Sequence, residues 1–386
     1  MFGLLCVLVI GGVITFALYT RSQRRRHEDS AAPPMSDSER QLAEIRRQPY
    51  LMFRNTALGP AYGQLSLVPL NAPDGVRYGT GLTCERVYGN SRSGLCLQAV
   101  REVFPTFKAV SFNSMFQAVH VFDLAGEPSR ARVSADGRLA AATVFISGHG
   151  YSGVGFSTRA AIFDLVSSTT LVDNLENFTV TKDGQPFRKT DFNFWGVTFA
   201  KDDDRFYATL ASAGINYLVE GSVSGRLMRV LRQGVECPSL APDGQRLVFK
   251  SRVVSNTGPH WQLHVWNLKT GSEITINESR SVDDQAEWLD ADHVLYGLPR
   301  NIEGSASWDI WTARADGTGM PRRFVSNASS PCVVRPGMEA ASGTKEIQPS
   351  QNTLANQILP PSASSTAIIL QTSNFFRLGK NAPVLR

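Results

Sequence analysis

The chain lacks the residue patterns that carry the common enzyme chemistries. It has no GxSxG nucleophile motif, because Val154 stands where the segment GHGYSG would need its last glycine. GHGYSG matches the GxGxxG spacing of dinucleotide sites, but a predicted strand follows it and not the helix that would bind a pyrophosphate. His260 and His264 lie around the start of a predicted strand, where their spacing separates them by roughly 13 Å and disfavours a shared metal. We therefore predict no catalytic residue, metal or cofactor, and favour a non-enzymatic role.

Charge and cysteine are also scarce. The formal net charge is +5 over 386 residues, and an arginine cluster near the N-terminus accounts for most of it. No basic face for nucleic acid remains. Cys6 lies in the apolar N-terminal stretch. Cys84, Cys237 and Cys332 fall at similar places in a repeated element, which suggests buried free thiols. Alternatively, Cys84 and Cys96, which flank one predicted hairpin, pair in an oxidising compartment.

A repeat runs through the middle of the chain. Six segments share an apolar triplet followed by a polar turn, for example QLHVWNLKTG and DIWTARADGTG. They recur at roughly 40- to 57-residue intervals, which is typical of propellers and solenoids. The aligned positions are Leu67, Phe122, Phe163, Glu220, Trp266 and Trp311. Glu220 is unexpected at an apolar position and indicates a local misalignment.

A second repeated element precedes most of these triplets. Its clearest copy is CPSLAPDGQRLVF, Cys237 to Phe249, with two apolar runs around an Asp-Gly turn, which predicts a hairpin. Each unit then has four antiparallel strands, a to d. We predict an all-β, six-bladed β-propeller over residues 49–337, with seven blades as the alternative. Tyr50–Asn55 reads as a strand b without its strand a, so the strand in Ser329–Gly337 would complete that blade and close the ring.

The segment APDGQRL and the DIW…DG element resemble the TolB-type, WD-like propeller repeat of bacterial cell-envelope proteins. The resemblance covers about Tyr50 to Gly337. It implies the propeller fold and a tendency to bind other proteins. TolB itself has an α/β domain before its propeller, and the residues available here before Tyr50 are too few for one, so no TolB-specific role is inferred.

The segments outside the repeat predict a membrane tether. Residues 1–20 form an uncharged apolar stretch long enough for a transmembrane helix that acts as a signal-anchor. Residues 21–48 form a basic juxtamembrane spacer with a short helix capped by Ser36 or Ser38. Residues 338–386 form a low-complexity tail that we expect to be disordered. The arginines after the span favour a cytoplasmic propeller, whereas the family resemblance favours an extracytoplasmic one.

Long loops between strands b and c indicate where a partner binds. Four such loops are predicted, at Asn55–Gly63, Ser147–Phe156, Arg252–Trp261 and Leu298–Trp308. In a propeller these loops lie on one face, around the mouth of the central channel, and loops on rigid scaffolds commonly carry binding. The candidate binding residues are His149, Tyr151, His260, Trp261, Arg300, Asn301 and Trp308. We expect a protein or peptide partner; a small ligand or metal bound at the channel mouth, or an enzyme acting there, is the alternative.

Overall fold

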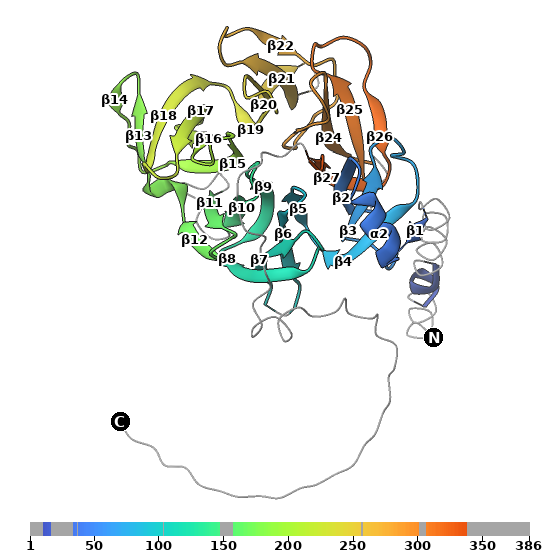
Figure 1. The fold of residues 1–386 in the computed structure, drawn as a ribbon. Coiled ribbons are helices and arrows are strands. Elements are labelled where there is room, and N and C mark those ends of the chain that lie inside the picture. Colours follow the sequence, from blue (N-terminus) through green and yellow to red (C-terminus); the bar gives the residue numbers. More distant parts are fainter. Residues whose placement is uncertain are drawn as a thin grey trace, which may run out of the picture.

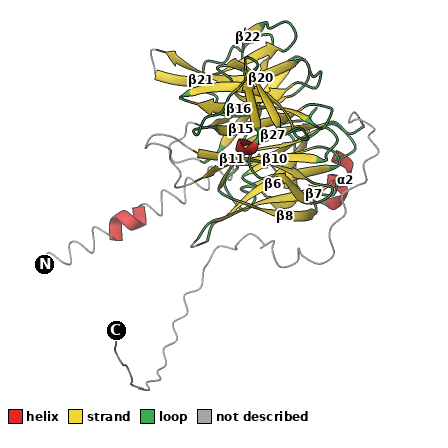
Figure 2. Cartoon of the chain, turned by 90° about the vertical axis from the view of Figure 1, so that its left-hand side faces the viewer, coloured by secondary structure: helices red, strands yellow, loops and turns green. Residues whose placement is uncertain are grey.

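The computed structural model describes residues 11–16, 34–36, 38–102, 104–146, 157–255, 258–300 and 306–337. In these residues the strands form six sheets that surround a common centre (Figure 1). Seen from the side, the six sheets together form a disc-shaped body (Figure 2). The predicted all-β propeller with six blades is confirmed.

Four blades take their strands in chain order, from the centre outward. Blade 2 consists of β5 (Arg86–Gly89), β6 (Ser93–Val100), β7 (Thr106–Asn113) and β8 (Ala118–Leu124). Blade 3 consists of β9 (Glu127–Val133), β10 (Leu139–Ile146), β11 (Ser157–Asp164) and β12 (Thr169–Val172). Blade 5 consists of β19 (Glu236–Leu240), β20 (Arg246–Ser255), β21 (Gly258–Asn267) and β22 (Glu273–Thr275). Blade 6 consists of β23 (Glu287–Trp288), β24 (His293–Pro299), β25 (Trp308–Arg314) and β26 (Arg322–Val325).

The other two blades carry additions at their outer edges. Blade 4 consists of β15 (Asn193–Phe199), β16 (Arg205–Ser212), β17 (Ile215–Ser222) and β18 (Leu227–Gln233). Its edge is extended by β13 (Thr179–Lys182), parallel to β18, and by β14 (Gln185–Pro186); the 3-10 turn η1 (Leu175–Asn177) precedes them. Blade 1 consists of β27 (Ala328–Val334), β2 (Tyr50–Asn55), β3 (Gln64–Pro69) and β4 (Arg77–Thr83), with β1 (Met35–Ser36) beside β4. Its inner strand β27 pairs antiparallel with β2, so this blade joins both ends of the repeat region.

The core is divided among the spaces between neighbouring blades. Each of six hydrophobic clusters joins two adjacent sheets, for example Phe194 and Phe206 of blade 4 with Ile162 of blade 3. Between blades 6 and 1, Phe53 packs with Ile310. Side chains on both faces of each sheet are therefore buried, which explains why the strands read as nearly continuous apolar runs.

Two details of the predicted repeat need correction. Phe122, aligned with strand c of the other units, lies on strand d of blade 2, because the true strand c, β7, ends in a turn at Asn113–Phe116 without the Asp-Gly signature. Glu220 is not misaligned: it pairs with Tyr207 across β16 and β17. The Tyr207 hydroxyl donates to its carboxylate at 2.9 Å and Arg229 contacts it at 2.6 Å, so a charge is satisfied at this position.

The cysteines are not equivalent. Cys237 has φ +48° and occupies a bulge in β19; the matching residue of β27 is Ser330, with φ +55°. Cys332 lies two positions further along its strand, so the sequence alignment was offset by the bulge. Both thiols are buried, and neither is part of a disulfide. Cys84 and Cys96 form a disulfide with a Cα–Cα distance of 5.3 Å. Of the two alternatives for these residues, buried thiols or a disulfide, the structure shows the disulfide.

A short helix packs on the propeller before the first blade. It is α2 (Glu39–Ile45), and Ser38 caps it by accepting from the Gln41 amide. Ile45 and Leu42 pack into the cluster between blades 1 and 2. Among the residues described, no helix has the length and apolar character needed to cross a membrane. The predicted span in residues 1–20 lies mostly outside the described residues, as does the predicted tail 338–386.

Candidate binding site at the channel mouth

The two faces of the disc carry different connections. We call the face with the b–c and d–a connections the mouth face, and the face with the a–b and c–d turns the turn face. The b–c connections cover residues 56–63, 101–105, 147–156, 213–214, 256–257 and 300–307. The predicted loop Arg252–Trp261 is wrong, because β20 and β21 pair continuously as far as Ser255 and Gly258. The valines in this stretch favour strand pairing, and the hairpin projects from one side of the disc (Figure 2).

A pocket of about 250 Å³ opens on the mouth face between blades 1, 2, 3 and 6, and we call it the mouth pocket. It is lined by Arg54, Tyr62, Glu85, Arg86, Glu127, Pro128, Ala306, Trp308 and Ser329. Most of these residues stand near the end of β2 or the start of β5, β9, β25 or β27. Strand ends from four blades meet here, which brings residues far apart in the sequence to one site.

Arg54 is held rigidly in the wall of the mouth pocket. Its Nε donates to the Cys84 carbonyl at 2.8 Å, and its Nη2 contacts the Glu85 carboxylate at 3.0 Å. Its guanidinium lies 4.7 Å from the centre of the Tyr62 ring. Glu85 also pairs with Arg101 at 2.9 Å. The Arg54 charge is therefore compensated within the protein.

Arg86 is compensated much less. Among the described residues its one ion pair is with Asp284, with 3.9 Å between Nη1 and Oδ1 and no side-chain hydrogen bond beside it; Asp283 adds a weaker electrostatic attraction. The other oxygen of Asp284 accepts from the Gly297 amide at 2.9 Å. Burial, and next the charge of Arg130, lower the pKa of Arg86. This guanidinium thus has free donors facing a pocket.

Further charged side chains line the inner strands beside the pocket. We call them the inner charge belt; its members are Arg130, Arg132, Glu236, Lys250, Asp283 and Glu287. Lys250 contacts Asp283 directly and lies 3.8 Å from Glu236. Burial would raise the pKa of Asp283, but Lys250 and the nearby arginines hold it below its usual value.

The deepest part of the belt surrounds Glu287. Its carboxylate accepts from the Tyr88 hydroxyl at 3.0 Å and from the Val333 amide at 3.3 Å, and it lies 3.8 Å from Arg132. Arg132 stacks over the Tyr88 ring at 4.4 Å. Burial raises the pKa of Glu287 despite the nearby Arg132. Blades 1, 2, 3 and 6 are thereby joined through polar groups at the centre.

The seven binding residues predicted from the sequence lie in different parts of the structure. Trp308 lines the mouth pocket. Trp261 packs against the inner charge belt: its Nε1 donates to Glu236 at 3.2 Å, and Lys250 lies 4.8 Å from its ring centre. Arg300 is committed to Asp309 and Asn327 at 3.1 and 2.8 Å, and so stabilises the blade 6 connection. His260 is half-buried on β21 and does not line the pocket. His149, Tyr151 and Asn301 lie outside the described residues.

Sequence reasoning missed the charged residues of the pocket and the belt. A signal was present: inner strands should be apolar, yet the copies of strand a contain CER, PSRAR, VEC and VDDQAE. Charges repeated at one end of a buried element indicate a polar channel. The long loops led to Trp308 of this pocket, but not to its charged side chains.

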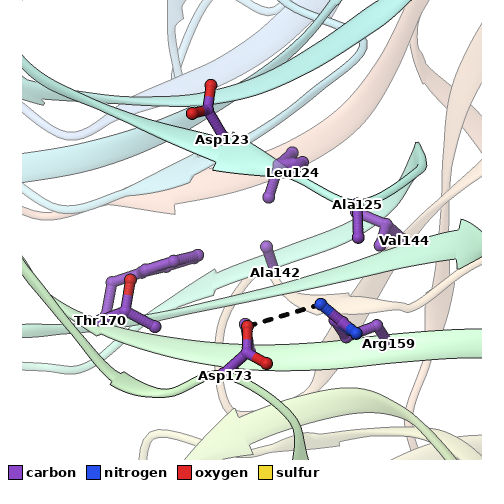
Figure 3. A pocket seen from close by; sticks show the side chains of 10 residues that line it. Asp123, Leu124, Ala125, Ala142, Val144, Arg159, Thr170 and Asp173 are labelled. Atoms are coloured by element: carbon purple, nitrogen blue, oxygen red, sulfur yellow. Dashed lines mark ion pairs between the residues drawn. The ribbon is translucent and has the colours of Figure 1, made fainter.

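A second hollow lies between blades 2 and 3 and shares no lining residue with the mouth pocket. Figure 3 shows Asp123 and Leu124 on one side and Arg159 and Asp173 on the other, with the last two 3.6 Å apart. Its volume is about 50 Å³, room for a few water molecules at most. It is a packing gap and not a candidate site. Among the described residues, no His, Cys, Asp and Glu side chains form a group that could hold a metal ion.

Comparison with known proteins supports the fold. No family model matches the sequence. No curated protein matches it either. TolB from Acinetobacter baumannii is similar in structure, with a TM-score of 0.51 and 13% identity; the match covers 74% of this chain and 66% of that TolB chain. A nidogen/laminin complex contains a chain with a TM-score of 0.48 and 11% identity, covering 74% of this chain and 98% of the other. The match to TolB supports a shared fold, and at 13% identity it says nothing about activity.

Proposed function

We propose that this chain is a membrane-tethered β-propeller of the cell envelope that binds a protein or peptide through its mouth face. The mouth pocket carries this proposal: an indole, Trp308, and two guanidiniums line one hollow on rigid strand ends. Tryptophan and arginine are the side chains most enriched at binding hot spots. A volume of about 250 Å³ is smaller than most drug-sized ligand sites and suits one or two side chains of a partner.

Partner binding is tested by blocking the mouth pocket without removing any packing. Ala306 is exposed and lines the pocket, so Ala306→Tyr should fill its opening and leave the thermal midpoint unchanged. Full-length protein is used to capture binding proteins from solubilised membranes of the source cells, and their amounts are compared by quantitative mass spectrometry. We expect specific proteins to be lost at least tenfold with Ala306→Tyr.

The matched control lies on the turn face. Met320 is 82% exposed in the c–d turn of blade 6, and Met320→Tyr should capture the same proteins as the wild type. Identical sets from the wild type and both variants would contradict binding through the mouth face.

We propose further that the tethered propeller lies on the extracytoplasmic side. The Cys84–Cys96 disulfide supports this placement, because disulfides persist mainly in oxidising compartments. The arginines at 21 and 24–26 favour the opposite orientation by the positive-inside rule. Protease added to cells with a permeabilised outer layer and an intact inner membrane should digest the propeller, while a cytoplasmic marker survives. Protection of both would reverse the orientation.

A further inference from the structure

The two arginines of the mouth pocket differ in how much of their hydrogen-bonding capacity the protein uses. Arg54 donates to a carbonyl, pairs with a carboxylate and stacks on Tyr62. Arg86 has only the 3.9 Å contact to Asp284, which is longer than a hydrogen bond. Its side chain is 21% exposed, so it is partly desolvated while it still faces the pocket. A guanidinium in this state gains most from an incoming acceptor with a negative charge.

The other charges of the pocket restrict what that acceptor can be. Glu85 is shared between Arg54 and Arg101 and adds little net charge. Glu127 is exposed, lines the same pocket and is not part of any ion pair among the described residues. One weakly paired cation and one carboxylate disfavour polyanions such as phosphate esters. They favour a single carboxylate whose neighbouring N–H group faces Glu127.

The position of Arg86 is fixed before any ligand arrives. Cys84, two residues earlier, is covalently joined to Cys96 of β6 and accepts from Arg54. The Glu85 amide donates to the Leu97 carbonyl at 2.7 Å. The start of β5 is therefore held by a disulfide and by hydrogen bonds on both sides, so little conformational freedom remains to be lost when a ligand binds.

We propose that the mouth pocket is a carboxylate subsite, in which Arg86 binds one carboxylate of a peptide partner beside Trp308. The carboxylate belongs either to the C-terminus of the partner or to an Asp or Glu side chain. This inference rests on the proposed function, because it names the chemistry by which the mouth face recognises its partner.

The test uses three short peptides with the full-length protein in detergent. The first is acetyl-Gly-Gly-Ala with a free carboxylate, the second is its amide, and the third is acetyl-Gly-Glu-Gly-amide. Binding is followed by ligand-observed NMR at millimolar concentration. We expect at least one carboxylate peptide to bind about tenfold more tightly than the neutral amide, which is typical for a charge-assisted hydrogen bond. The peptide that binds shows whether the terminal or the side-chain carboxylate is recognised.

Arginine variants then assign the effect to one residue. Arg86→Gln should reduce carboxylate binding about tenfold, to the level of the amide peptide, and Arg86→Lys should keep part of it. Arg159→Gln, in the hollow between blades 2 and 3, is the matched control and should bind like the wild type. The thermal midpoint of each variant reports folding.

Three results would overturn the inference: equal binding of acid and amide peptides, unchanged binding by folded Arg86→Gln, or no binding of any carboxylate peptide to the wild type. If any of these occurs while Ala306→Tyr still loses its partners, the carboxylate inference is wrong and the proposed function stands. If Ala306→Tyr keeps its partners, the proposed function fails by its own experiment.

Discussion

The mouth face and the turn face are built from the same six sheets but satisfy their polar groups differently. On the turn face, side chains hydrogen-bond their own turns: Asp243 accepts from the amide of Gln245 at 2.7 Å, and Asn267 from that of Lys269 at 2.9 Å. Around the mouth, partners come from distant segments, such as Arg130 with Asp283 and Arg132 with Glu287. The turn face is therefore held largely by local bonds, with added contacts between neighbouring blades such as Ser93 Oγ to the Gly137 carbonyl at 2.6 Å, whereas the mouth exists only when the ring is assembled.

Glu287 should show the largest effect, because it joins several blades through a buried carboxylate. Glu287→Ala leaves Arg132 buried without its charged partner, and we expect a loss of about 3 kcal/mol in the free energy of unfolding. Glu287→Gln keeps an acceptor for Tyr88 and Val333, and because burial raises the pKa of Glu287, it should cost about 1 kcal/mol. Chemical denaturation of full-length protein at neutral pH measures both.

The matched comparison is Glu220, whose carboxylate contacts Tyr207 and Arg229 on the outer part of blade 4. Because Arg229 is largely exposed, Glu220→Ala should cost no more than about 1 kcal/mol. If both alanine variants lost the same free energy of unfolding, interactions between blades at the centre would be no more important for stability than those within one blade.

The disulfide should have the next largest effect. It joins Cys84 and Cys96 at a sequence separation of 12, and the combined Cys84→Ala and Cys96→Ala variant should lose about 2–3 kcal/mol. Dithiothreitol should destabilise the wild type by a similar amount and leave the double variant unchanged. A wild-type protein that is insensitive to the reductant would show that this crosslink does not stabilise the mouth face.

The difference between local and distant interactions also decides what could be predicted from the sequence. The repeated PDG-like turns and apolar triplets depend on neighbours in the chain, so six blades and most of their hairpins could be predicted. Arg86 could not be recognised as a candidate, because its neighbours Asp284 and Arg130 come from other blades. The predicted loop at Arg252–Trp261 was wrong for a different reason. Its valines continue the paired strands β20 and β21, which extend as far as Ser255 and Gly258.

On the turn face, one residue departs from its repeat and should show the smallest effect. Asp203 occupies the position of Gly137 and Gly244 in the equivalent turns, with φ +55° against +84° and +71°. Burial and the adjacent Asp136 carboxylate raise the pKa of Asp203 to about 7. In the unfolded chain this pKa is about 3.8. The folded protein therefore holds a proton that the unfolded chain has lost between about pH 4 and pH 7.

The sign of the pH dependence follows from this difference. The contribution of Asp203 to stability is fully present below pH 4 and is lost as the pH rises through 7. Asp203→Asn keeps the shape and tolerates positive φ, so it should melt like the wild type near pH 4 and at a higher temperature at pH 8. The gain should stay below about 1 kcal/mol, because the site is partly exposed.

Asp243 provides the control of opposite sign in the equivalent turn of blade 5. Burial would raise the pKa of Asp243, but the Gln245 amide and Arg246 hold it below its usual value. Asp243→Asn should therefore lower the melting temperature at pH 8. If both variants shift in the same direction, the Asp136–Asp203 pair, which joins the turns of blades 3 and 4, does not control the pH dependence of this face.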